Sequence, residues 1–184
     1  MLAFVFWHSP SAGVKPADYE GSLRAFHQAL AAHAPEGYLR SAAFAFRGAP
    51  WFPVTAGYLD WYAVTDFASL GFLNEAAVSG ARKEPHDNAA RLAGAGFGGL
   101  YRMIAGRMNF HDTHFGTWLQ KPDGLDYDAF REQAGALVHP ESMALWQRQM
   151  SLGPGLEFCL LSPAKVSAPE AFLPVAIELR QVWS

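Results

Sequence analysis

The stretch LAFVFWHSPSAGVKPADYEGSLRAFHQAL, residues 2–30, decides the fold of this chain. Residues 2–7 are apolar without a break, as in a strand that is covered on both faces. Apolar residues at spacings of four, three and four follow, and this stripe predicts a helix: Tyr19, Leu23, Phe26 and Leu30. The stretch therefore predicts a buried strand and an amphipathic helix that packs on it.

Four further elements complete a first half. Residues 38–47 and 58–64 are expected to be two strands of a hairpin, joined by a turn rich in glycine and proline. A helix begins at Phe67, a shorter helix begins near Pro85, and residues 97–104 resemble a fourth strand. The predicted order is β-α-β-β-α-β, the ferredoxin-like arrangement.

The stretch WLQKPDGLDYDAFREQAGAL, residues 118–137, echoes the first half. Other echoes follow in the same order: Asp18-Tyr19-Glu20 with Asp126-Tyr127-Asp128, Phe6-Trp7 with Trp118-Leu119, Gly48-Ala49-Pro50 with Leu152-Gly153-Pro154, Leu59-Asp60-Trp61-Tyr62 with Leu156-Glu157-Phe158-Cys159, and Asp66-Phe67-Ala68 with Pro169-Glu170-Ala171. We expect one globular unit of two ferredoxin-like repeats, residues 1–108 and a shorter 109–184 that lacks a full fourth strand. One irregular α+β domain with coincidental echoes is the alternative.

Each expected repeat is an antiparallel sheet with helices on one face, so its other face must be buried, most simply against the other repeat. This α+β pattern, with Asp18-Tyr19-Glu20 and Asp126-Tyr127-Asp128 opening matching helices, resembles the dimeric α+β barrel superfamily. That group includes antibiotic-biosynthesis-monooxygenase-like, EthD-like and chlorite-dismutase-like proteins. The resemblance implies a pseudo-dimeric barrel with helices outside, and ligands between sheet and helices or within the barrel. It brings no catalytic signature with it, because fold does not fix function.

Composition excludes several classes of partner. The 184 residues carry a formal net charge of −3 and contain no run of Lys or Arg, which argues against binding to nucleic acid or to a membrane surface. The single cysteine, Cys159, cannot form an internal disulfide and suits a reducing compartment, so we expect a cytoplasmic protein. The apolar N-terminal run is too short for a signal peptide.

The segment Gly94-Ala95-Gly96-Phe97-Gly98-Gly99 matches the spacing G-x-G-x-x-G. A dinucleotide site needs a strand before this motif and a helix after it. Here a helix precedes and a strand follows, so the segment is interpreted as a helix end and the entry to a strand.

Three residues are candidates for catalysis: His86, Asp87 and His8. The pair His86-Asp87 could orient a base for proton transfer, although Asp near a helix start also suits the helix dipole. His8 leaves the first strand on the same side as Phe4 and Phe6, at the mouth of a possible pocket. His27, beside the helical stripe, is interpreted as a core-edge residue or a base that faces a ligand.

Charged residues inside predicted strands are a second group of candidates. A buried charge is costly unless it is paired, so these residues form structural ion pairs, lie on a solvent-exposed edge, or make a polar spot in an aromatic cavity. The aromatic residues, with Trp146, could equally form a plain core. The candidate ligand-binding set is Trp7, Arg40, Trp61, Tyr62, Tyr101, Trp118, Arg148 and Glu157, with Asp60 matching Glu157 in the other half.

The cluster His111-Asp112-Thr113-His114 is the densest group of polar ligands. His111 and His114 could hold zinc, iron or haem; a solvated linker between the repeats is the alternative.

The leading hypothesis is a protein that binds a small apolar or aromatic molecule without a cofactor, with oxygenase-like chemistry if it is an enzyme. A haem or metal protein of chlorite-dismutase-like type, using His86, His111, His114 or His139, is one alternative. A non-catalytic interaction protein is another, and an edge left open by a shortened second repeat would favour a homodimer.

Overall fold

The computed structural model describes residues 1–150 and 153–184. Leu152, in the predicted second hairpin turn, lies outside the described residues. Among the described helices, none is both long and apolar enough to cross a lipid bilayer.

The first half contains four strands and three α-helices in the predicted order. They are β1 (Leu2–Pro10), α1 (Pro16–Ala32), β2 (Tyr38–Arg47), β3 (Ala56–Val64), α2 (Phe67–Ala77), α3 (Lys83–Leu92) and β4 (Ala93–Gly106). A 3₁₀ turn, Gly80–Arg82, joins α2 to α3. Helix α1 begins at Pro16, and the Asp66 carboxylate accepts a 2.9 Å hydrogen bond from the Ser69 amide at the start of α2.

The second half contains a full set of four strands, so the expectation of a missing fourth strand is wrong. Its elements are β5 (Phe115–Leu119), α4 (Tyr127–Gly135), β6 (Ala144–Gln149), β7 (Phe158–Ser162) and β8 (Val175–Trp183). The helix expected after Pro169 is a 3₁₀ turn over Glu170–Phe172 only. The chain needs no long helix there, because a short turn already returns it to β8.

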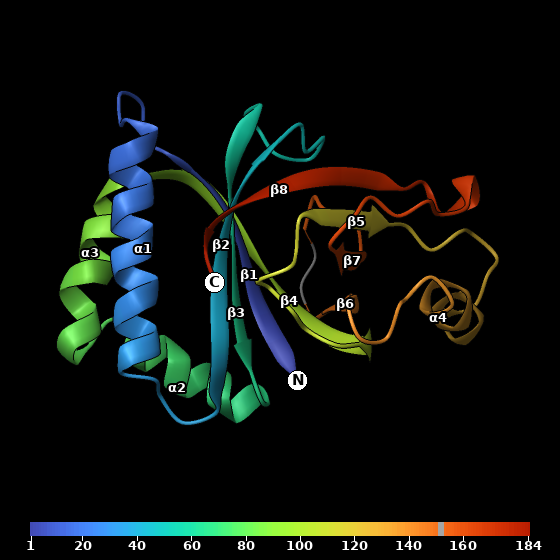
Figure 1. The fold of residues 1–184 in the computed structure, drawn as a ribbon, viewed down its shortest axis with the longest axis horizontal. Helices are drawn as coiled ribbons and strands as arrows, with labels where there is room; N and C mark the ends of the chain where they lie inside the picture. Colours follow the sequence, from blue (N-terminus) through green and yellow to red (C-terminus); the bar gives the residue numbers. More distant parts are fainter. Residues whose placement is uncertain (151–152) are drawn as a thin grey trace.

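The eight strands form one closed antiparallel barrel in the order β1-β3-β2-β8-β5-β7-β6-β4. The first half contributes β4-β1-β3-β2 and the second half contributes β8-β5-β7-β6, so both halves have the same internal strand order. Pairing of β2 with β8 and of β4 with β6 joins them. The helices lie outside, with α1, α2 and α3 over the first half and α4 beside the second (Figure 1). Closure removes the open edge that the sequence suggested.

Large aromatic side chains fill the barrel interior. Four tryptophans are almost fully buried there: Trp7, Trp61, Trp118 and Trp146. The rings of Trp7 and Trp118, which come from different halves, have centroids 5.0 Å apart. A second cluster packs the outer face of the first half against α1–α3, and a third packs the second half against α4.

Alternation along the strands decides which side chains meet the helices. Leu59 and Trp61 point into the barrel, so Asp60 between them points outward to α1. The same alternation shows that the predicted equivalence of Phe6 with Trp118 is offset by one residue: Trp118 belongs to the interior, as Trp7 does. A shift of one residue exchanges the two faces of a strand.

Candidate functional site

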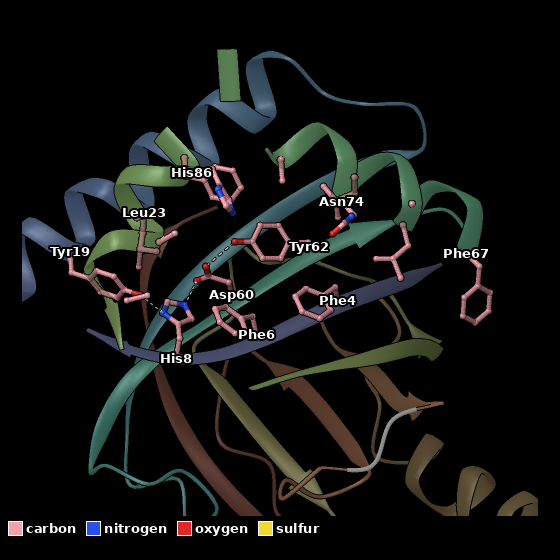
Figure 2. A pocket seen from close by; sticks show the side chains of 18 residues that line it. Phe4, Phe6, His8, Tyr19, Leu23, Asp60, Tyr62, Phe67, Asn74 and His86 are labelled. Atoms are coloured by element: carbon pink, nitrogen blue, oxygen red, sulfur yellow. Dashed lines mark hydrogen bonds and ion pairs between the residues drawn. The ribbon is translucent and has the colours of Figure 1, made fainter. Parts of the chain in front are cut away.

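A cavity of about 640 Å³ lies between the outer face of the first half and helices α1–α3. Its walls are mostly apolar, with His8, Asp60 and Tyr62 on the side of the sheet and Asn74 and His86 on the side of the helices (Figure 2). The lining includes Phe4, Phe6, Leu23, Phe26, Phe67, Leu70, Gly71 and Leu73, together with His8, Tyr19, Asp60, Tyr62, Asn74 and His86. An apolar pocket with a few converging polar groups is typical of small-molecule sites.

Glycines of β4 make room for two of the pocket's aromatic rings. Phe6 is paired with Gly98 and His8 with Gly96 across β1 and β4. A Cβ atom on Gly98 would lie 2.5 Å from the Phe4 ring, and one on Gly96 would lie 2.8 Å from the Phe6 ring. The G-x-G-x-x-G segment therefore serves close packing of aromatic side chains beside the pocket.

The polar side of the pocket is built around the buried carboxylate of Asp60, which is 1% exposed. Nε2 of His8, from β1, lies 3.2 Å from Oδ1, and Nε2 of His27, from α1, lies 3.3 Å from Oδ2. The Tyr62 hydroxyl donates a 2.9 Å hydrogen bond to Oδ2. Both histidine contacts are off the ideal hydrogen-bond axis, and neither Nε2 atom has another partner among the described residues, so electrostatic attraction holds them.

Burial and the two imidazoles determine the charge state of Asp60. Burial alone would raise the pKa of Asp60, but the imidazoles of His8 and His27 lower it by more, so the net pKa lies well below the usual range. Burial and the negative charge of Asp60 together raise the pKa of Tyr19 and of Tyr62. At neutral pH the site therefore holds a carboxylate anion beside two protonated phenols.

Both imidazoles are held from their far sides as well. Nδ1 of His8 lies 2.7 Å from Oη of Tyr19, and Nδ1 of His27 lies 2.7 Å from Oγ of Ser41. The Tyr38 hydroxyl donates to the same Ser41 oxygen at 2.8 Å. A continuous chain of polar contacts thus runs from Tyr38 through Asp60 to Tyr19, which lines the pocket, and part of it is drawn in Figure 2.

His86 of α3 faces the pocket from the helical side (Figure 2). Its Nδ1 lies 3.2 Å from Oδ1 of Asp87, and its ring packs edge-on against Phe26 with centroids 5.4 Å apart. Asp87 also pairs with Lys83 and lies away from the cavity. The imidazole of His8 thus lies on the sheet side of the pocket, and the imidazole of His86 lies on the helical side.

The predicted site residues separate into three groups: some line the cavity, some lie in the barrel core, and the rest lie elsewhere. His8, Tyr62 and His86 line the cavity, and Asp60 joins them. The barrel core takes the remaining aromatic candidates: Trp7, Trp61, Tyr101 and Trp118.

The other charged candidates lie elsewhere. Arg40 is exposed on β2. Arg148 donates hydrogen bonds to the carbonyls of Gly153 and Gly155. Glu157 accepts hydrogen bonds from Tyr127 and Gln147, so this carboxylate belongs to the second half.

His111 and His114 are both exposed in the connection between β4 and β5. Within residues 1–150 and 153–184, no three His, Cys, Asp or Glu side chains are grouped to hold a metal ion. Both ring nitrogens of His8 and of His27 already face protein groups, which leaves neither a lone pair for haem iron. Of the imidazoles of His8, His27 and His86, only that of His86 is therefore left as a candidate ligand for a metal ion or haem iron in this pocket.

Tyr19 is the site residue that sequence reasoning missed, because it was assigned to the apolar stripe of its helix. Its hydroxyl faces His8 because that helix lies across β1, a contact between positions 11 residues apart that no periodicity predicts. His27 had a weaker signal: a histidine beside an apolar stripe and an aspartate inside a strand are both costly to bury alone.

No protein-family model matches the chain, and no curated protein matches it in sequence. A solved structure from Fusobacterium nucleatum subsp. nucleatum ATCC 25586, provisionally named a monooxygenase, superposes with a TM-score of 0.65 over 98% of this chain and 92% of that chain, at 11% identity. The fold is that of the dimeric α+β barrels. A protein provisionally named a chlorite dismutase has 14% identity and a TM-score of 0.48 over 98% of this chain and 94% of that chain. At 11% identity the first of these likenesses shows a shared fold alone, so the activity of this chain has to be argued from its own pocket.

Proposed function

We propose that this protein binds a small apolar or aromatic molecule in the cavity between the first sheet and helices α1–α3, and acts on it by acid–base chemistry. The observation that carries the proposal is the buried Asp60–His8 pair at the wall of an otherwise apolar cavity of about 640 Å³. A buried carboxylate is expensive, so its place at a pocket rather than in the closed core is typical of a functional site.

The division of the pocket lining into apolar and polar residues supports a small apolar or aromatic substrate. Phe4, Phe6 and Phe26 offer ring faces and edges to an apolar body, while Tyr19, which contacts His8, offers its hydroxyl oxygen at one side. His86, held by Asp87, offers a second imidazole from the opposite wall. A ligand between them meets polar groups on both walls of the pocket.

Oxygenase-like chemistry is the reaction that we propose to test first. Removal of a proton makes an apolar aromatic compound electron-rich and therefore more reactive toward O₂. In a cofactor-free oxygenation of a methylene group, CH₂ and O₂ give C=O and H₂O, so the substrate supplies all four electrons that reduce O₂ and both hydrogens of the water. The fold neighbour named as a monooxygenase is a reason to test this chemistry first.

The test is titration of the protein with 2-methoxynaphthalene, an apolar aromatic probe, followed by calorimetry and by NMR. We expect saturable binding at one site, with signals of Phe4, Phe6 and Phe26 shifting. Absence of saturable binding by this probe and by naphthalene would contradict the proposal. O₂ consumption with electron-rich aromatic substrates then tests the oxygenase step separately.

A further inference from the structure

We propose that the pocket selects ligands that donate a hydrogen bond, phenols and enols, and that Tyr19 accepts this hydrogen bond and passes the ligand's proton to His8. The inference rests on the proposed function and names the substrate class of the same pocket. It is carried by the directions in which the buried hydrogen bonds must run.

Asp60 sets these directions. An ionised carboxylate accepts hydrogen bonds and donates none. Nε2 of His8 and Nε2 of His27 both face it, at 3.2 and 3.3 Å, so each of these nitrogens must carry its proton toward the carboxylate. A bare nitrogen lone pair there would be repelled.

The His27 side of the chain is complete without the pocket. The Tyr38 hydroxyl donates to Ser41, which leaves the Ser41 hydrogen free to be donated to Nδ1 of His27. In this proposal His27 needs no partner from the pocket, and its role is to position Asp60.

The His8 side ends at the pocket. In this proposal His8 carries a single ring proton, on Nε2, so that Nδ1 accepts a hydrogen bond from the Tyr19 hydroxyl 2.7 Å away. The one hydrogen of Tyr19 is thereby used inside the protein. The lone pairs of its oxygen remain for the cavity that Tyr19 lines, so a matching ligand must bring a donor.

In the proton transfer from the ligand through Tyr19 to His8, one bond forms for each bond that breaks. The ligand's O–H bond breaks and a new O–H bond forms on Tyr19, while the original O–H bond of Tyr19 breaks and an N–H bond forms at Nδ1 of His8. No electrons are transferred between molecules. The ligand becomes an anion and His8 becomes an imidazolium that the Asp60 carboxylate stabilises.

The titratable groups around His8 and Tyr19 come from three elements. They are His27 on α1, Tyr58, Asp60 and Tyr62 on β3, and His86 on α3. The Tyr62 hydroxyl already donates to Asp60, and His86 is held by Asp87. Tyr19 therefore forms the direct link between a ligand and His8.

Two probes of similar shape test the inference: 2-naphthol donates a hydrogen bond and 2-methoxynaphthalene does not. We expect wild-type protein to bind 2-naphthol about tenfold more tightly, the effect of pairing one buried acceptor. Equal affinities would overturn this inference while leaving the pocket proposal in place. Binding of neither probe would overturn the pocket proposal and this inference with it.

Tyr19→Phe keeps the ring and removes the acceptor. We expect this variant to lose the preference for 2-naphthol, measured as the ratio of its affinities for the two probes. It should also lose the long-wavelength absorption of naphtholate that we expect on binding to wild-type protein. An unchanged preference in Tyr19→Phe would overturn the inference.

The variant Asp60→Asn distinguishes a merely structural role of Asp60 from the proposed role, in which Asp60 sets the directions of the hydrogen bonds. The amide oxygen should face Tyr62 and His27, so the amide NH₂ faces His8 and moves the proton of His8 to Nδ1. Tyr19 then accepts from His8 and turns its own hydrogen toward the cavity. We expect the ligand preference to fall to parity or invert, whereas a retained tenfold preference in folded Asp60→Asn protein would overturn the inference.

Discussion

Substitution of Gly71 by leucine is a direct way to fill the cavity without disturbing the barrel. Gly71 lies within α2 and lines the pocket, and an added Cβ atom would meet nothing within 4 Å. Gly21 of α1 offers a matched control: it is exposed, as Gly71 is, and its added Cβ also meets nothing within 4 Å, but it lies outside the lining. The two variants add the same side chain to two helices and differ in where it goes.

The expected sizes follow from helix propensity and from lost contact. Leucine in place of glycine in a helix interior stabilises by about 0.7–1 kcal/mol, so both variants should gain stability. For a chain of this length the gain corresponds to a rise in Tm of about 2–4 °C. If the side chain introduced by Gly71→Leu displaces two buried methylene-sized parts of the ligand, at about 0.8 kcal/mol each, affinity falls slightly more than tenfold.

Calorimetric titration with 2-methoxynaphthalene and thermal unfolding of the three proteins check these values. We expect weak binding by Gly71→Leu, wild-type binding by Gly21→Leu, and similar stabilisation of both. Wild-type affinity in Gly71→Leu would refute the reasoning, because the ligand would then bind elsewhere.

Three further predictions concern the carboxylate, the glycines and the core. Because the pKa of Asp60 is lowered below its ordinary 3.8, its contribution to stability is present above that pH and is lost as pH falls. The unfolding free energy of Asp60→Asn should therefore fall less steeply with acid than that of wild-type protein, by up to about 1.4 kcal/mol per pH unit. Equal slopes of unfolding free energy against pH, measured in urea at pH 2–4, would count against this. Gly98→Val, whose Cβ would meet the Phe4 ring, should lower both stability and probe affinity, and unchanged affinity would show that this ring does not bound the site. Trp146→Ala should cost about 3–5 kcal/mol of unfolding free energy while keeping the preference for 2-naphthol, and loss of that preference in folded protein would place the ligand inside the barrel.

Much of the fold could be predicted because strands and helices leave periodic traces. The apolar run of residues 2–7 and the stripe from Tyr19 to Leu30 predicted β1 and α1, and the need to cover the bare face of each sheet predicted two facing halves. The last strand was missed, although residues 175–183 alternate between buried and exposed positions. The alternation of apolar and polar residues in this segment indicates a strand, but matching the second half to the first drew attention away from it.

The site was harder to predict because its members meet only in three dimensions. His8, Asp60 and His27 come from two strands and a helix, and each could be recognised only as a polar residue in an apolar setting. The interior tryptophans were hard to assign for a different reason. An aromatic composition does not distinguish a packed core from a pocket wall, and alternation along β3 decides it by sending Trp61 inward and Asp60 outward.

The most direct test of the central claim is a crystal structure with 2-naphthol bound. We predict that its ring lies between the Phe4 and Phe6 side chains and helices α1–α3, with its hydroxyl within hydrogen-bond distance of Oη of Tyr19. A naphthol ring inside the barrel among the tryptophans, or on the outer surface with this cavity empty, would contradict the account.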